Sequence, residues 1–245
     1  MNHPVFTNPL TELAEYEEMV ECLKKDQGPI HVSGSLDSQK VHLMHELASG
    51  RDWRLVITYD DSKAREIYED FRYFDDAVYL YPARDLLFFS ADIHGNLLTR
   101  QRMEVFRHIL EDTHGTVVTT LDGLMDHLLP LSELSRHILT LEEGQTLDIE
   151  KWKQDLIYMG YERTGQVTGM GQFSIRGGIL DIFPLTEEMP IRVELWDDEV
   201  DSIRTFDPES QRSVERLETL SIYPASELIL TEDEVENGIR RLEEE

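Results

Sequence analysis

The chain has 245 residues, of which 40% are hydrophobic, enough for one large domain or two modest ones with ordinary cores. Its 50 acidic and 23 basic side chains give a formal net charge of −27, which disfavours nucleic-acid binding because no local cluster of basic residues is visible. One cysteine, Cys22, excludes an internal disulfide, and the lack of a membrane-length apolar run or a signal peptide favours a cytoplasmic protein without membrane contacts.

The first 50 residues are expected to form two helices with a short strand between them. Apolar residues recur at helical spacing from residue 13 to residue 23, and Thr11 suits the N-cap of that helix. Residues 29–33 (PIHVS) have the composition of a strand, and a loop and a second helix follow, ending at Gly50.

The loop before the second helix has the spacing of a nucleotide-binding P-loop but lacks its chemistry. The pattern G-x-x-x-x-G-K-[ST] needs its second glycine for close backbone approach to phosphate, and its hydroxyl for the metal ion. Here the pattern begins at Gly34 and keeps Lys40, but Gln39 and Val41 occupy those two positions. Asp37 adds a negative charge that would repel a triphosphate. Whether this is a degraded P-loop or an ordinary strand–turn–helix, we expect no ATP binding and no cofactor.

A strand–helix alternation continues to about residue 130. Strands are expected at residues 53–59, 77–81 and 115–120, and helices at 60–74, 97–110 and just after 120. This rhythm predicts a parallel sheet with right-handed crossovers, so residues 1–130 are expected to form an α/β domain.

Residues 131–220 are expected to form a second, α+β domain. A strand at 137–141 and a helix at 148–159 precede three strand-like segments, at residues 172–176, 179–183 and 191–196. Between the first two of these, Gly177 and Gly178 mark a bulge or a tight bend in an antiparallel sheet. Residues 221–224 are expected to return towards the first domain, and a charged helix follows at 231–245.

Alternation in the strand at 191–196 predicts that Arg192 and Trp196 face outward, and the same parity places Arg176 with them. Exposed tryptophan and arginine together have the composition of an interface hot spot. A structural alternative is that the arginines pair across strands with Glu194 or Asp181 while Trp196 lies flat over them. The pattern favours neither interpretation over the other.

The stretch GQFSIRGGILDIFP, followed by PIRVELWDDEVDSIRTFDPESQRS, resembles the module shared by the UvrB and Mfd (transcription-repair coupling factor) families, and its RGG and QRS elements favour Mfd. The resemblance implies a degenerate helicase-like (P-loop type) parallel-sheet domain 1A at residues 1–130. It also implies an inserted antiparallel-sheet domain 2 at 131–220, which docks UvrA, and the start of domain 1B at 221–245. The family's contact positions match Arg176, Arg192 and Trp196.

No catalytic or metal-binding constellation is evident in the sequence. His42 and His45 lie one helical turn apart, but no further ligand accompanies them, and a solvated helix explains the spacing. We therefore expect no enzymatic activity from this fragment, although whole members of the family are ATP-dependent DNA translocases. The abrupt end of the sequence suggests that a longer protein continues from it.

The resemblance implies that the chain recruits UvrA to a stalled RNA polymerase, with polymerase and DNA contacted by the remainder of a longer protein. One alternative is a UvrB-like, nucleotide-dependent DNA-binding enzyme. The altered P-loop position and the short connection carrying Phe88 and Phe89, where UvrB has a long hairpin, disfavour it. Another is a mainly autoinhibitory domain, whose outward face the rest of the protein covers.

Overall fold

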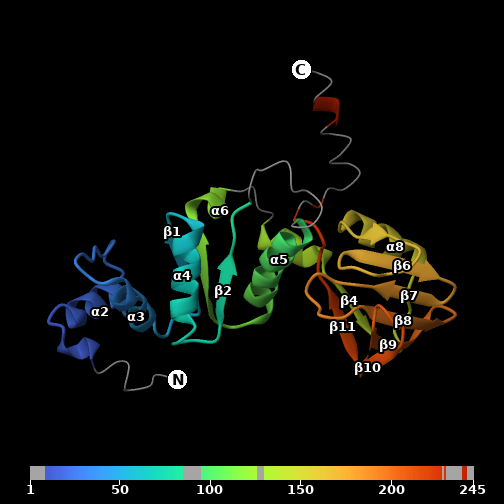
Figure 1. Cartoon of the computed structure of the whole chain (residues 1–245), viewed down its shortest axis with the longest axis horizontal. Coiled ribbons are helices and arrows are strands. Elements are labelled where there is room, and N and C mark those ends of the chain that lie inside the picture. Colours follow the sequence, from blue (N-terminus) through green and yellow to red (C-terminus); the bar gives the residue numbers. More distant parts are fainter. Residues whose placement is uncertain (1–8, 85–94, 126–129, 228, 230–238, 242–245) are drawn as a thin grey trace. The chain divides into compact units, whose positions relative to one another are not determined.

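The chain is described here by a computed structural model that covers residues 9–84, 95–125, 130–227, 229 and 239–241 (Figure 1). Its contacts divide it into two compact units. The first unit is Met1–Arg84 with Glu111–Asp126, and the second is Asp85–Leu110 with His127–Glu245. The segment with Phe88 and Phe89, and most of the expected C-terminal helix, lie outside the described residues.

The first unit is built on a three-stranded parallel sheet in the order β1-β3-β2. Its strands are β1 (Trp53–Thr58), β2 (Val78–Tyr81) and β3 (Gly115–Thr120). Helix α4 (Asp61–Phe71) links β1 to β2, and the Asp60 side chain caps it by accepting the Lys63 backbone N–H at 2.7 Å. The expected parallel sheet is confirmed, and the short helix α6 (Leu121–Met125) follows β3.

One face of this sheet is covered by α4 and by α3 (Asp37–Leu47). Buried apolar side chains from both helices meet those of β2 and β3 in one cluster. The members of this cluster are Val41, Ala64, Phe71, Val78 and Val118. The second expected helix is therefore confirmed as a packed element of the first unit.

Two expectations for the N-terminal region are wrong. Thr11 lies within a short 3-10 helix, η1 (Leu10–Glu12), and the following α-helix α2 (Tyr16–Lys24) begins only after Leu13 has taken an extended conformation. Residues 29–33 form no strand. A strand needs a neighbour to pair with, and an apolar composition alone does not supply one.

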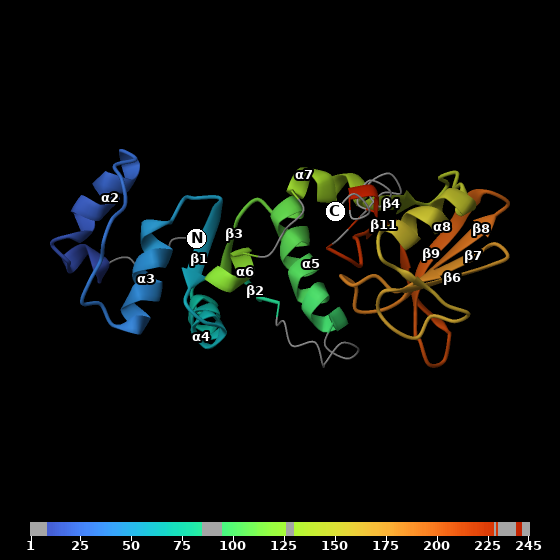
Figure 2. The same cartoon turned by 90° about the horizontal axis from the view of Figure 1, so that it is seen from above.

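The second unit contains a six-stranded sheet in the order β10-β9-β8-β7-β6-β5, antiparallel except between β5 and β6. Helix α8 (Ile149–Tyr158) packs against one face of it, through Trp152 and Leu156 (Figure 2). The strands are β5 (Glu162–Arg163), β6 (Gln172–Arg176), β7 (Ile179–Ile182), β8 (Ile191–Trp196), β9 (Glu199–Phe206) and β10 (Ser213–Leu217).

A separate antiparallel pair joins the beginning of this unit's sheet region to its end. Strand β4 (Leu139–Glu142), which follows the short helices α7 (Leu131–Leu134) and η2 (Ser135–His137), pairs with β11 (Thr219–Ile222). Ser221 and Ile222, at the start of the segment expected to return towards the first domain, pair with β4, and that return stays a prediction. The apolar residues of both strands complete the core under α8, which explains the pairing.

Helix α5 (Gly95–Glu111) makes its described polar contacts with the second unit, although the sequence places it in the first domain. Arg102 and Glu227 are both buried, with Nε and Oε1 2.7 Å apart. Arg107 Nη1 donates to the backbone carbonyl of Thr186 at 3.2 Å. The boundary expected at residue 130 remains a prediction, and periodicity could not show with which unit α5 packs. No helix in the described ranges is long and apolar enough to cross a membrane.

Candidate functional site

The outward face of the six-stranded sheet lies opposite the face that packs against α8. Register aligns Ser174 of β6 with Asp181 of β7, and Asp181 with Arg192 of β8. The residues on either side of Arg192, Ile191 and Val193, are fully buried in the α8-side core. The predicted alternation of this strand is therefore confirmed at Arg192.

A tight turn at Gly177 and Gly178 connects β6 directly to β7. Gly177 has a φ of 59°, a left-handed conformation that favours glycine. A Cβ at Gly178 would lie 2.8 Å from the backbone oxygen of Leu195, so a larger residue there would force β8 or the turn to shift. Of the two predictions for this glycine pair, a bulge or a tight bend, the structure has the tight bend. The turn places Arg176 at the end of the hairpin.

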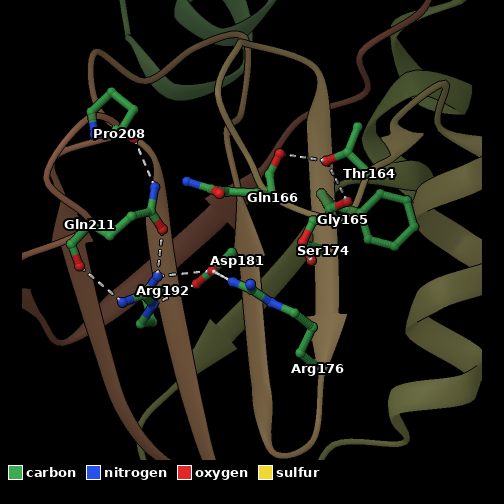
Figure 3. A network of polar contacts seen from close by, with 10 residues as sticks. Thr164, Gly165, Gln166, Ser174, Arg176, Asp181, Arg192, Pro208 and Gln211 are labelled. Atoms are coloured by element: carbon green, nitrogen blue, oxygen red, sulfur yellow. Dashed lines mark hydrogen bonds and ion pairs between the residues drawn. The ribbon is translucent and has the colours of Figure 1, made fainter.

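Asp181 is the centre of the polar network on this face (Figure 3). Its side chain is 1% exposed and binds two guanidinium groups. Arg192 donates from Nε to Oδ1 at 2.7 Å and from Nη2 to Oδ2 at 2.9 Å, and Arg176 donates from Nη2 to Oδ2 at 3.1 Å. The two arginines compensate the buried negative charge, and the bidentate pair also fixes the plane of the Arg192 guanidinium.

Arg192 is held on its other sides as well. Its Nη1 donates to the backbone carbonyl of Gln211 at 3.2 Å, and its Nη2 to the Gln211 side-chain oxygen at 3.1 Å. The guanidinium carbon lies 4.5 Å from the centre of the Phe206 ring, a cation–π distance. The hydrogen bonds to Asp181 raise the pKa of Arg192. With 16% of its side chain exposed, Arg192 presents little surface to a partner.

Arg176 and Trp196 are the accessible members of the predicted site. The side chain of Arg176 is 53% exposed and Trp196 is 81% exposed. Trp196 ends β8 opposite Glu199, immediately before a turn in which Asp197 has a φ of 59°. Since Trp196 is so exposed, it does not lie flat over the arginines.

The structure confirms the cross-strand pairing of the arginines, and the interface interpretation stays a prediction. Both arginines pair with Asp181 across the strands, as the structural alternative proposed. Glu194 instead accepts a hydrogen bond from Ser202 Oγ at 3.0 Å. The exposure of Trp196 is what the interface interpretation requires. Gln211 was missed, because its contribution depends on a backbone carbonyl and a left-handed φ of 59° that no residue spacing reveals.

Comparison with known proteins finds relatives of this chain. Residues 139–228 match the UvrB interaction domain. Over 217 residues, the chain is 37% identical to the transcription-repair-coupling factor of Staphylococcus aureus strain Mu50, an alignment that covers 87% of this chain and 18% of that protein. It is 34% identical over 211 residues to the same factor of Staphylococcus haemolyticus strain JCSC1435, covering 85% of the chain and 18% of the relative.

The chain belongs to the transcription-repair-coupling factor family. It spans about 18% of the length of the coupling factors it matches. The matched interaction domain begins at Leu139, the first residue of β4, and contains the whole Asp181 network.

At the P-loop position of this coupling-factor chain, the side chains are engaged in local contacts. Lys40 Nζ lies 2.8 Å from Asp37 Oδ1, and Lys63 Nζ lies 2.9 Å from Asp37 Oδ2. The hydrogen bond from Lys40 is the largest cause that lowers the pKa of Asp37 to about 2. Val41 is buried in the core, and Gln39 Oε1 accepts the Leu36 backbone N–H at 3.0 Å.

The loop itself also departs from a phosphate site. Gly34 adopts a left-handed φ of 80°, but no strand precedes it to form a strand–loop–helix. Within the described part of the coupling-factor chain, no group of three or more metal-ligating side chains comes together, and His42 stacks on Phe74 with ring centres 5.3 Å apart.

Proposed function

We propose that the second unit is the module through which a transcription-repair-coupling factor recruits UvrA, and that this chain neither binds nor hydrolyses ATP. The observation that carries the proposal is the arrangement on the outward face. Trp196 is exposed at the end of β8, Arg176 is half-exposed at the end of β6, and Arg192 is fixed by the buried carboxylate of Asp181. The match of residues 139–228 to the UvrB interaction domain supports the choice of this unit.

The network lowers the cost of docking at Arg176. Among the described contacts, Arg176 donates only to Asp181, through Nη2, so its other N–H groups face solvent. A guanidinium already oriented by a buried partner loses less side-chain entropy when it binds a carboxylate or carbonyl of UvrA. Arg176 thus supplies directed polar contacts at the centre of the proposed interface.

Trp196 supplies the apolar anchor. Its ring is large and has two side-chain torsions, so burying it against a partner removes much apolar surface from water at a small entropic cost. The turn at Asp197 holds it at the end of β8. Arg192 contributes indirectly, by holding Asp181 and the neighbouring strands in place.

The coupling step itself requires contacts that this chain does not supply. In the proposed scheme, other parts of a longer coupling factor bind the stalled RNA polymerase and DNA, and this unit brings UvrA to them. Another part of the longer protein can also cover Trp196 until polymerase is engaged. Such autoinhibition and UvrA docking would use one face and are compatible.

The test is a calorimetric titration of purified UvrA with the chain and with Arg176→Ala and Trp196→Ala variants. If both residues are hot spots, each variant should lose about 2 kcal/mol of binding free energy, or roughly a thirtyfold rise in Kd. The matched control is Tyr73→Ala, which removes an equally exposed aromatic residue from the first unit and should leave the affinity unchanged.

Unchanged affinity of both variants would remove the assignment of this face. Failure of the parent chain to bind active UvrA would remove the recruitment function itself.

A further inference from the structure

The outward face of the second unit carries a row of three arginines on neighbouring strands. Register aligns Arg192 of β8 with Arg204 of β9, and Arg204 with Arg216 of β10. Ile203, next to Arg204 in the chain, is fully buried in the core under α8, so Arg204 faces away from that core. Directly opposite residues of an antiparallel pair have Cβ atoms about 5 Å apart, and like charges there destabilise the pairing.

Carboxylates neutralise the two outer members of this row. Asp181 accepts hydrogen bonds from Arg192 on both of its oxygens. Glu143 does the same for Arg216, whose Nε donates to Oε1 at 2.7 Å and whose Nη2 donates to Oε2 at 2.8 Å. Each outer arginine therefore has a carboxylate in a bidentate pair.

The middle arginine, Arg204, has no such pair. Its Nε is buried, and among the described residues it has no hydrogen-bond partner. The hydrogen bond from Arg216 is the largest cause that lowers the pKa of Glu143, and the charge of Arg204 makes a smaller contribution. Glu194, also on this face, accepts instead from Ser202 Oγ at 3.0 Å. Arg204 is partly exposed, so its charge is open to a partner from outside the chain.

The surroundings of Arg204 favour a carboxylate partner over a nucleic acid. Binding to a phosphate backbone draws on several uncompensated cations, whereas the neighbours of Arg204 are already neutralised. One uncompensated guanidinium fits one aspartate or glutamate side chain, which it can bind through two parallel hydrogen bonds. Since Arg204 is the register partner of Arg192, such a carboxylate would lie next to the proposed docking residues.

We propose that Arg204 binds an aspartate or glutamate side chain of UvrA, so that the docking surface continues from β8 onto β9. This inference rests on the proposed recruitment of UvrA by the second unit. In the free chain, the charge of Arg204 is unfavourable between Arg192 and Arg216. In the complex, the carboxylate of UvrA compensates that charge, and Arg204 thereby favours the bound state.

The test is a calorimetric titration of purified UvrA with Arg204→Gln. We expect about tenfold weaker binding, because a carboxylate of UvrA would then face an uncharged amide. Arg204→Lys keeps the charge but not the planar fork, so its affinity should lie between those of the parent and Arg204→Gln. The matched control is Arg163→Gln. Arg163 is exposed on β5, and its register partner Phe173 belongs to the core under α8, so this variant should bind UvrA as the parent does.

The stability of the free chain separates a docking role from a structural one. Arg204→Gln removes a like charge from between Arg192 and Arg216, so the free variant should melt at the same temperature as the parent or at a higher one. A structural arginine would lower the melting temperature when it is replaced. The affinity difference between the parent and Arg204→Gln should also shrink as salt is raised, because salt screens exposed charges.

Parent-like affinity of folded Arg204→Gln would overturn the inference, and if Arg176→Ala still lost binding, the recruitment function would stand. A lower melting temperature of Arg204→Gln would also overturn it, since the arginine would then support the sheet itself. Absence of UvrA binding by the parent chain would remove the recruitment function, and this inference with it.

Discussion

Asp181 determines how two of the three predicted site residues are oriented. Its carboxylate is almost inaccessible to water and receives hydrogen bonds from Arg176 and Arg192. The strand parity of Arg176 and Arg192 could be predicted from the sequence, as could Asp181 as one of two possible partners. The bidentate geometry and the contacts of Gln211 could not, because they depend on how the segment after β9 folds back over Arg192.

Replacing Asp181 with asparagine should destabilise the second unit by about 3 kcal/mol, because two guanidinium groups then lose the buried charge that compensates them. Urea denaturation of the parent and variant chains measures this difference. The control is Glu150→Gln, which removes a surface partner of Lys153 and should change stability little. If Asp181→Asn were as stable as Glu150→Gln, the carboxylate would not organise the network.

The variant also separates stability from docking. At a temperature where Asp181→Asn remains folded, its affinity for UvrA should fall, because Arg176 is no longer held in one orientation. A folded variant that binds UvrA as tightly as the parent would show that Asp181 does not position Arg176.

Among the elements, those with a packed apolar face were predictable from the sequence. The strands β1, β3, β6 and β8 lie where alternating or continuous apolar residues placed them, and α8 packs on the sheet through its apolar side. The segment at 29–33 has a similar composition but lacks a neighbouring strand. The composition of a segment shows that it can form a strand, but the strand forms only where a neighbouring strand provides hydrogen bonds.

The β6–β7 turn gives a prediction at this scale. Gly178→Ala should destabilise the second unit by about 1–3 kcal/mol, because the new Cβ would press on the backbone of Leu195 in β8. Gly165→Ala is the matched control, since a Cβ there meets nothing within 4 Å. Thermal unfolding of the two variants makes the comparison. Equal melting temperatures would mean that β8 can move away from the turn at no cost.

At the scale of the whole molecule, the net charge and the residues at the P-loop position both lead us to expect no DNA or nucleotide binding. The net charge of −27 gives the chain an unfavourable long-range interaction with DNA phosphates. Lys40 is paired with Asp37, and Val41 is buried where a nucleotide site needs a hydroxyl. Both observations disfavour the alternative of a UvrB-like, nucleotide-dependent DNA-binding enzyme.

We therefore expect the isolated chain to show no saturable binding of labelled duplex DNA at near-physiological salt, with or without Mg-ATP. Fluorescence anisotropy provides the measurement, and a DNA-binding P-loop ATPase provides the positive control. Binding that strengthens at lower salt and depends on Mg-ATP would restore the alternative, because phosphate contacts are salt-dependent.

The pairing of β4 with β11 has a consequence for how this protein can be rearranged. Leu139 and Ile222 are register partners, so the polypeptide enters and leaves the sheet region of the second unit through neighbouring positions. A segment with adjacent ends can be spliced into a loop of an unrelated host without stretching either of them. Residues 139–222, which contain the Asp181 network, are therefore suited to insertion as one unit into a loop of a carrier protein.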